Sequence, residues 1–487
     1  MNSRRSVLLV SAQTLGAIIA GCLAVAVLPA VAVVPWPTHR VAPLSTVVEP
    51  AASPQLRACP GPLLSLGANA AAATSATSYG SSTTTVAVDP ASARVLTSKL
   101  ADPGNRRAST DGQPSAISVE SGAVSFGLLA GASSQVANLE TARGFAAASC
   151  VEPSLDSWLV GGSTSVGRTT LVSLANPSDV AATVDLAIAG EEGDVLSQAA
   201  RGILVPPRTR RIIPLSGLAP NLESPVIHVT SSGGPVAATL QYTSLVGLVP
   251  AGVEMIGPTA APATTQFLPG FLVTELAATS VVGEAHEGTD FPALRLYSPS
   301  TEAVQVSVGL LSESGGGGTV LDVTLQPGRV SDIPLGNVQP GSYTVRVQAN
   351  APVVAAARAV TGTLATLDAS GTTGSAPSLD VGWMVAPLPL LRNQAVAVPA
   401  GPSPVLHLMN PGTTAAAVTV TVSGTTQTLD VPPGMGSTVS VGADTPVLLA
   451  GTEGLYGSVS FAGVGQVAGF GVQPPGPQDS PIRVYPR

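Results

Sequence analysis

One sequence motif occurs three times in the chain, and it constrains the fold more than any other feature. It reads LVSLANPSDVAATVDL at residues 171–186, LRLYSPSTEAVQVSV at 294–308 and VLHLMNPGTTAAAVTV at 405–420. Each copy carries alternating apolar residues around a proline, and a valine lies seven residues beyond that proline. This pattern predicts two short strands joined by a tight turn, each with one buried face. We therefore expect a β-hairpin in every copy.

Two further motifs follow each copy in the same order. The second is ILVPPRTRRIIPL (203–215), VTLQPGRVSDIPL (323–335) and LDVPPGMGSTVSV (429–441), and the third is IHVTSSGGPVAATLQY (227–242), VRVQANAPVVAAARAV (345–360) and VSFAGVGQVAGFGV (459–472). Three hairpins and one extra strand give about seven strands in roughly 110 residues, the size of an immunoglobulin-like β-sandwich. Trp158, Phe267 and Trp383 are expected to fill the cores from the first strand of each sandwich.

Composition supports β-structure and argues against nucleic-acid binding. Hydrophobic residues make up 45% of the 487 residues, but aromatic residues only 3% and charged residues 10%, and there are 52 Gly and 44 Pro. Glycine and proline both disfavour long helices. The net charge of −8 is unsuited to a phosphate backbone. The one dense basic cluster, RTRR at 208–211, is interpreted as a solvated strand edge.

The amino terminus predicts an exported protein. Arg4 and Arg5 precede an apolar run of 28 residues from Val7 to Val34, which exceeds the roughly 20 residues that span a bilayer. The two arginines orient the start toward the cytoplasm, so the chain after Trp36 is expected outside the cell. An uncleaved anchor is favoured. A lipoprotein processed at Cys22 and ordinary signal cleavage remain the alternatives, and all three export the rest of the chain.

The two remaining cysteines fit an oxidising compartment. Beyond Cys22 the chain contains only Cys59 and Cys150, and a disulfide between them is the simplest interpretation, with two buried free thiols as the alternative. The predicted chain is mainly β, with an N-terminal transmembrane helix followed by tandem immunoglobulin-like β-sandwich domains. The expected segments are a cytoplasmic tip and anchor (1–36), a stalk linker (37–57), a small disulfide-bracketed β-domain (58–150) and three sandwich repeats (151–255, 256–375 and 376–487).

A family resemblance follows from these residues. The amino-terminal anchor, a cysteine shortly before WLVGG at 158–162, and the Leu-x-Asn-Pro repeats resemble the actinobacterial envelope proteins grouped as the DUF5719 family. The middle repeat departs from the motif because Ser298 replaces the asparagine. The resemblance implies an uncharacterised membrane-anchored envelope protein, and it implies no catalytic residue.

The search for catalytic or metal-binding motifs gives little. His228 and His407 are interpreted as ordinary outward-facing strand residues, because neither has a carboxylate nearby in the sequence. The segment GEAHEGTD (283–290) contains the one local cluster with metal-ligand chemistry. A solvated connection is the favoured interpretation of that segment, and no cofactor is predicted. The weak metal candidates are Glu284, His286, Glu287 and Asp290.

The sequence therefore predicts a non-enzymatic protein with a structural, scaffolding or adhesive role at the cell envelope. Its exterior is expected to be a short rod of tandem sandwiches that holds an unidentified envelope protein or wall polymer, and no nucleic acid. One alternative is an accessory subunit of a membrane-bound glycan or cell-wall enzyme. A second alternative is an envelope hydrolase whose carboxylate pair is assembled only in the folded chain.

Overall fold

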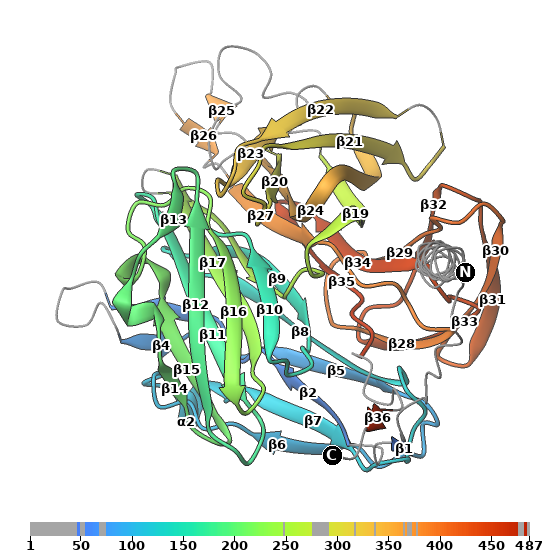
Figure 1. Ribbon diagram of the computed structural model, residues 1–487, viewed down its shortest axis with the longest axis horizontal. Helices are drawn as coiled ribbons and strands as arrows, with labels where there is room; N and C mark the ends of the chain where they lie inside the picture. The colour runs from blue at the N-terminus through green and yellow to red at the C-terminus, as the bar shows by residue number, and fades with distance from the viewer. Residues whose placement is uncertain are drawn as a thin grey trace, which may run out of the picture. The chain divides into compact units, whose positions relative to one another are not determined.

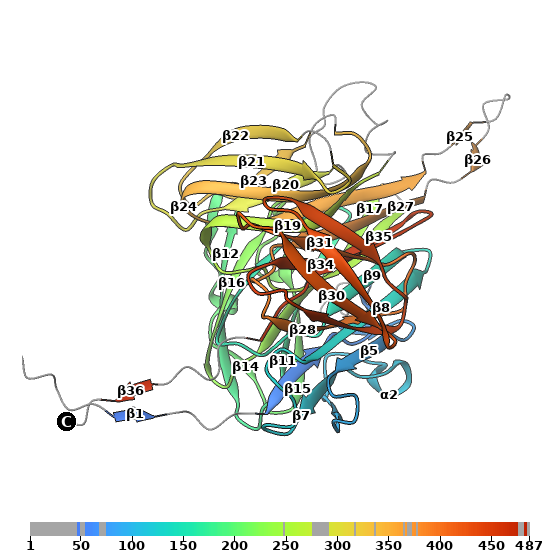
Figure 2. The same ribbon diagram turned by 90° about the vertical axis from the view of Figure 1, so that its right-hand side faces the viewer.

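The computed structural model describes residues 46–48, 54–67, 75–246, 249–274, 292–315, 318–335, 338–363, 366–367, 373–375, 378–475 and 482–484. They belong to two bodies. In the smaller body, β1 (Thr46–Val48) pairs antiparallel with β36 (Ile482–Val484), as Figure 2 shows. The predicted anchor with Arg4 and Arg5, and the metal candidates Glu284, His286, Glu287 and Asp290, lie outside the described residues. No helix of the described part is long and apolar enough to cross a membrane.

The larger body, residues 52–478, consists mostly of antiparallel strands, which confirms a mainly β chain. Its described helical elements are the short helix α2 (Ala108–Asp111) and the 3-10 turns η2 (Gln198–Ala200) and η3 (Leu215–Gly217). The strands form four groups, which we call module A (residues 55–149), module B (156–256), module C (263–385) and module D (393–471). In Figure 1 they follow one another from blue through green and yellow to red.

Modules B and D each contain two separate sheets. In module B the first sheet has the order β10 (Asp156–Val160), β16 (Val226–Gly233), β12 (Ala182–Gly190), and both β13 (Gly193–Val195) and β14 (Ile203–Val205) pair with β12. The second sheet of module B has the order β15 (Thr209–Pro214), β11 (Arg168–Asn176), β17 (Ala237–Val246), β18 (Val249–Ile256). In module D the orders are β28 (Asn393–Val398), β33 (Thr445–Ala450), β30 (Ala416–Val422), β31 (Thr425–Val431), and β32 (Gly436–Ser440), β29 (Val405–Met409), β34 (Tyr456–Gly463), β35 (Gln466–Gly471).

Module C repeats this arrangement with one strand shared between its sheets. The first half of the long strand β24 (Gly341–Thr363) pairs with β19 (Ala263–Val273) and β21 (Val304–Ser312), and the second half pairs with β20 (Ala293–Tyr297) and β27 (Ser378–Val385). The edge strands are β22 (Thr319–Leu325) beside β21 and β23 (Ser331–Pro334) beside β20. A small hairpin, β25 (Thr366–Leu367) with β26 (Thr373–Ser375), precedes β27.

All three modules share one strand order. Eight strands are common to the three modules when β14 and the hairpin of β25 and β26 are left out and the two halves of β24 are counted as strands 6 and 7. One sheet then has the order 1-6-3-4 and the other 5-2-7-8. Strands 2 and 5 and strands 3 and 6 are neighbours, as in an immunoglobulin sandwich, but strand 1 lies beside 6 instead of 2, strand 4 beside 3 instead of 5, and strand 7 beside 2 instead of 6. Apolar side chains from both sheets of a module join one core, as Leu174 of β11 and Val184 of β12 do in module B.

Module A is a reduced fourth copy of the same arrangement, which the sequence motifs did not predict. The order β2 (Gln55–Cys59), β7 (Ser115–Val119), β6 (Leu96–Lys99) reproduces strands 1-6-3, and β5 (Thr83–Val88), β8 (Leu129–Asn138), β9 (Arg143–Ser149) reproduces 2-7-8. Between β6 and β7 the chain forms α2 where the other modules place strands 4 and 5. The hairpin β3 (Leu64–Leu66) with β4 (Ala76–Ser78) is an insertion. Cys59 and Cys150 form the predicted disulfide, which links β2 to the residue after β9.

The prediction that each recurring motif forms a hairpin is wrong for the first motif, whereas the third motif of module D does form one, from β34 and β35. The two strands of the first motif, β11 with β12 and likewise β20 with β21 and β29 with β30, lie in opposite sheets and do not pair. Asn176 explains the crossing, because its buried amide donates hydrogen bonds to the carbonyls of Val180 and Val205, at 2.8 and 3.0 Å. Asn410 makes the same two bonds in module D, to Thr414 and Val431. Ser298 substitutes in module C by donating to the Pro352 carbonyl at 2.7 Å.

Two further expectations need correction. Trp383 was placed on the first strand of the third repeat, but its strand β27 pairs with β24 and is the last strand of module C. The expected short rod of tandem sandwiches is also wrong, because modules A to D form one compact body. Their last strands contact one another in the cyclic order β9, β18, β27, β35 and back to β9. Apolar side chains lie on both faces of these strands, so one face packs in the core of its own module and the other packs against a neighbouring module. Ala146 of β9 and Val253 of β18 belong to one buried cluster of this second kind.

Candidate functional site

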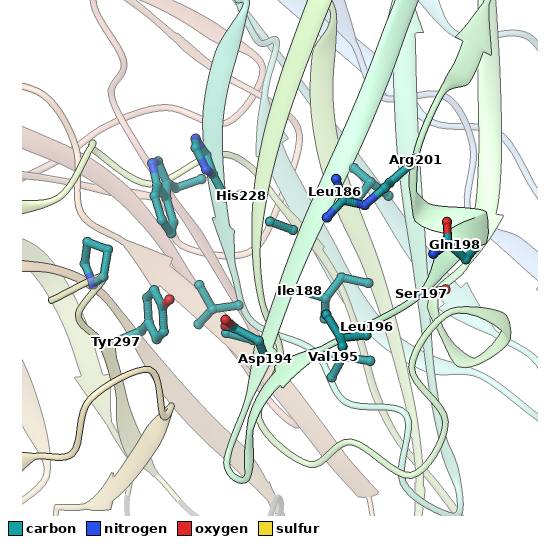
Figure 3. Close-up of a pocket in the computed structure, with 15 residues that line it drawn as sticks. Leu186, Ile188, Asp194, Val195, Leu196, Ser197, Gln198, Arg201, His228 and Tyr297 are labelled. Carbon is teal, nitrogen blue, oxygen red and sulfur yellow. The ribbon is translucent and has the colours of Figure 1, made fainter. Parts of the chain in front are cut away.

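A surface hollow between modules B and C has the size of a ligand site. We call it the aromatic pocket; its volume is about 470 Å³, within the usual range for small-molecule sites. The outer face of the module B sheet forms its floor, and Tyr297 and Pro299 of module C close one side (Figure 3). The remaining lining residues are Trp158, Leu186, Ala187, Ile188, Ala189, Asp194, Val195, Leu196, Ser197, Gln198, Arg201, Val226 and His228.

Strand register builds the aromatic side of this pocket. Trp158 on β10 lies directly opposite His228 on β16, and their rings stack with centroids 4.2 Å apart and an interplanar angle of 8°. The Asp156 carboxylate holds the imidazole through a 2.7 Å contact to Nε2. Ala187 lies opposite His228 on the other side and contributes only a methyl group, which leaves space above the sheet. Because Trp158 covers one face of the imidazole, the partly exposed His228 ring presents its opposite face to this space.

Polar side chains also line the aromatic pocket. Asp194 belongs to β13, and Gln198 and Arg201 lie in and just after η2; all three are exposed. Figure 3 shows His228 and Tyr297 on one side of the pocket, with Arg201 and Gln198 across from them. Burial, and secondarily the charge of Asp194, raise the pKa of Tyr297, so its phenol remains protonated near neutral pH. The pocket thus combines ring faces with groups that donate and accept hydrogen bonds.

A second hollow, of about 610 Å³, lies where the segments between modules converge. Its walls come from residues 151–158, 235, 236, 238, 258–261, 388 and 473–474, together with Arg57 of β2. The guanidinium of Arg57 donates to the carbonyls of Leu129 and Gln473, at 2.9 and 3.3 Å. Arg57 is therefore already used to tie modules A and D together.

A serine, histidine and glutamate form a triad-like chain of contacts between modules C and D. His407 Nδ1 lies 2.6 Å from Glu313 Oε2, and His407 Nε2 lies 2.7 Å from Ser460 Oγ. Burial alone would raise the pKa of Glu313, but the hydrogen bond and charge of His407, with bonds from Ser342 and Gly270, lower it. The ionised carboxylate only accepts hydrogen bonds, so His407 carries its hydrogen on Nδ1.

This triad is sealed from solvent. Ser460 and His407 are 2% and 1% exposed, and neither lines a described pocket. A Cβ atom on Gly270 would lie 2.7 Å from His407 Cδ2, so module C backbone lies against the imidazole. No substrate carbonyl has space to approach Ser460 Oγ. These contacts hold module D against module C.

A carboxylate pair is also assembled, at the meeting point of the four last strands. Asp380 of β27 accepts backbone hydrogen bonds from Phe145, Val253, Val381 and Val467, at 2.9, 3.3, 3.0 and 3.1 Å. Nearby Glu254 of β18 accepts from Ala147, Met255 and Trp383. Both carboxyl groups are fully buried, and this desolvation raises their pKa values well above the ordinary range. They join modules, and no described pocket reaches their oxygens.

Comparison with known proteins decides the family. The model of a family of unknown function, DUF5719, matches residues 105–403, which is more than half of the chain. The chain belongs to the DUF5719 family. The search of curated proteins found no match.

Two solved structures were also found. One, described as the crystal structure of Thermotoga maritima 1070, is 16% identical, covers 25% of this chain and 93% of its own, and has a TM-score of 0.18. The other, described as the BSP domain of a biofilm associated protein, is 10% identical, covers 91% of this chain and 99% of its own, and has a TM-score of 0.14.

In this DUF5719 protein, several sequence interpretations change. His228 and His407 both have carboxylate partners, Asp156 and Glu313, contributed by other strands or by another module. Pairing across strands leaves no trace in the local sequence, which is why this was missed. Trp158, expected to fill the core of a sandwich, belongs to a buried apolar cluster with residues of both modules B and C, and it also lines the aromatic pocket. Within the described residues, no group of three or more His, Cys, Asp or Glu side chains is placed to hold a metal ion.

The basic cluster RTRR is divided between surface and interior. Arg208 forms an exposed pair with Asp179 at 2.8 Å, which fits the predicted solvated edge. Arg210 instead is buried and pairs with Asp102 of module A. Arg208 lies before β15 with φ +54°, and within β15 the alternation of side chains separates buried Arg210 from exposed Arg211.

Proposed function

We propose that this protein is a non-enzymatic, membrane-anchored binding protein of the cell envelope. Four immunoglobulin-related modules form a compact exterior body, and the chain holds an envelope protein or wall polymer near the membrane. The proposed anchor is the apolar run from Val7 to Val34, oriented by Arg4 and Arg5. The disulfide between Cys59 and Cys150 supports an oxidising compartment outside the cytoplasm.

The contrast between buried catalytic residue types and an open pocket supports the proposed binding function. The catalytic residue types that the fold gathers, Ser460 with His407 and Asp380 with Glu254, are enclosed by backbone and leave no space for a substrate. The aromatic pocket, by comparison, is open, and its polar side chains Asp194, Gln198 and Arg201 are exposed. A site that is open to ligand but holds no such triad is suited to binding instead of turnover.

The test has two parts, both on the full chain extracted from membranes in detergent. Intact mass before and after reduction and alkylation is expected to show the full-length chain with two cysteines blocked until reduction. Crosslinking in intact cells is expected to join the protein to an envelope component. A chain that fractionates as cytoplasmic with free thiols, or purified protein that hydrolyses envelope glycans or peptides, contradicts the proposal.

A further inference from the structure

We infer that the aromatic pocket binds a neutral sugar ring of an envelope polysaccharide. The inference rests on the proposed binding function and identifies its ligand. It starts from the lining of the pocket: the aromatic rings of Trp158, His228 and Tyr297 lie on one side. Asp194 lies close to Tyr297, and the exposed groups Gln198 and Arg201 lie across from it.

The aromatic side requires a ligand with a flat apolar face. His228 is held in plane by stacking on Trp158 and by the contact from Nε2 to Asp156, so its ring orientation is fixed before any ligand arrives. The Tyr297 ring lies 6.0 Å from Trp158, tilted by 34°. Both side chains are largely buried, so the free face of His228 supplies most of the aromatic surface and the edges of the other two rings border it. A pyranose presents C–H groups on one face, and these pack well against such rings. Fixed aromatic groups also lose little conformational freedom on binding.

The polar groups of the pocket require a ligand that both donates and accepts hydrogen bonds. Arg201 only donates, ionised Asp194 only accepts, and Gln198 does both. Among the described residues, the side chains of Asp194, Gln198 and Arg201 have no hydrogen bond or ion pair that would occupy them. Hydroxyl groups around a sugar ring satisfy all three.

Other ligand classes fit less well. An anionic ligand would be repelled by Asp194, and a cationic one by Arg201. A purely apolar peptide side chain would leave the polar groups without partners, which costs binding energy. The hollow of about 470 Å³ also matches a small ring or two in size. The almost fully exposed Leu196, at the edge of the pocket, provides an apolar surface for the next residue of a chain.

The experiment uses the detergent-extracted full chain and saturation-transfer NMR, followed by calorimetry. The probes are neutral tetrasaccharides built from mannose, galactose or N-acetylglucosamine. At least one is expected to bind saturably. Arg201→Ala and Asp194→Ala are expected to lower its affinity by about tenfold or more, since each removes a charge-assisted hydrogen bond. Both residues are exposed, so these variants are expected to fold. His228→Ala is expected to abolish the transfer signal on the ring C–H protons.

The matched control is Arg329→Ala, which removes another exposed arginine whose one described ion pair, to Glu192, lies on the surface. It is expected to leave affinity unchanged. Binding that is equal in wild type, Arg201→Ala and Asp194→Ala places the sugar elsewhere and overturns the inference. So does the absence of binding to every probe.

The outcomes also separate this inference from the proposed function. If no sugar binds but a photo-crosslinker at position 196 captures an envelope protein, the binding function stands and the sugar assignment falls. If a sugar binds with the expected variant effects but is cleaved during incubation, the pocket assignment stands and the non-enzymatic function falls.

Discussion

At the scale of single residues, this fold depends on buried polar side chains that bond to backbone groups of other elements. Asn176 and Asn410 are buried, and each donates to one carbonyl in the following turn and to one carbonyl on a strand of the opposite sheet. Both also accept a hydrogen bond two residues further on, from the backbone of Ser178 and Gly412. The Asn-Pro pairs visible in the sequence therefore mark the points where the chain crosses between sheets.

Replacing Asn410 with alanine is expected to lower the free energy of unfolding by about 2–4 kcal/mol. The buried carbonyl of Val431 and the partly buried carbonyl of Thr414 lose their donor, and an unsatisfied buried group costs roughly 1–3 kcal/mol. Asn410→Ser is expected to cost less, because Ser298 fills the corresponding position in module C. Denaturant unfolding measures both. Gln427→Ala, on the exposed strand β31, is the control, and an equal effect there would refute the argument.

Acid is expected to weaken the contact between Glu313 and His407. The native pKa of Glu313 is lowered from 4.5, so the unfolded chain takes up the proton first as pH falls. The stability from this carboxylate is therefore full above about pH 5 and is lost as pH falls through the native pKa. Glu313→Gln removes this dependence, and at pH 7 it is expected to cost about 3–5 kcal/mol by breaking a buried pair.

Chemical unfolding of wild type and Glu313→Gln between pH 3 and pH 7 measures the difference. The difference in the free energy of unfolding between the two proteins is expected to shrink toward low pH. If this difference stays constant from pH 3 to pH 7, the ionisation of Glu313 does not contribute to stability. Thr324→Ala, an exposed substitution on β22, controls for general effects of acid on a variant.

At the scale of elements, the sequence predicted strands well and their partners poorly. Alternating apolar residues and proline turns reveal the two strands of each motif, but not whether they pair or cross to opposite sheets. That choice depends on distant carbonyls such as those of Val205 and Val431, which the local pattern does not contain. The sequence predicts module A as a small β-domain, but not its likeness to the other modules, because α2 replaces two strands and the motif with them. The aromatic pocket needs residues from two modules, and the sequence singles out only Trp158, as a core residue, and His228, as an ordinary strand residue.

The disulfide of module A stabilises its smaller pair of sheets. It joins β2 in one sheet to the residue after β9 in the other, across a sequence separation of 91 residues. Replacing both cysteines with serine is expected to lower stability by about 2–4 kcal/mol. Hydrogen exchange of β2 and β9 amides in the double variant measures the loss. The control is the wild-type protein in reductant, which is expected to show the same loss of amide protection as the double variant. If the double variant keeps the protection of the oxidised wild type, the disulfide does not stabilise module A.

At the scale of the whole larger body, each junction between modules contains a buried or partly buried polar contact. Arg210 pairs with Asp102 between modules B and A, and Arg295 of module C donates to the Gly162 carbonyl of module B at 2.8 Å. His407 and Glu313 join D to C, and Ser134 of A donates to the Ala400 carbonyl of D at 2.5 Å. Such contacts penalise separation of the modules, since each partner would lose its hydrogen bonds.

Asp380 connects all four modules, because its carboxyl oxygens accept hydrogen bonds from backbone amides of β9, β18, β27 and β35. A Cβ atom on Gly144, whose φ is +143°, would lie 2.1 Å from Asp380 Oδ1, so the strands close tightly around this carboxyl. Asp380→Ala is therefore expected to cost more than about 4 kcal/mol, by leaving several buried amides unpaired. The loss is expected to reduce hydrogen-exchange protection in all four modules together, since a closed ring unfolds as one cooperative body.

The control for this last prediction is Asp430→Ala, which removes an exposed carboxylate from β31 of module D. It is expected to leave protection unchanged in every module. If Asp380→Ala loosens module C alone, the modules are independent domains that merely touch, as in a tandem array. Loss of protection in β9 and β35 at the same midpoint as in β27 identifies the ring as the unit of stability, which also fixes the two halves of the aromatic pocket relative to each other.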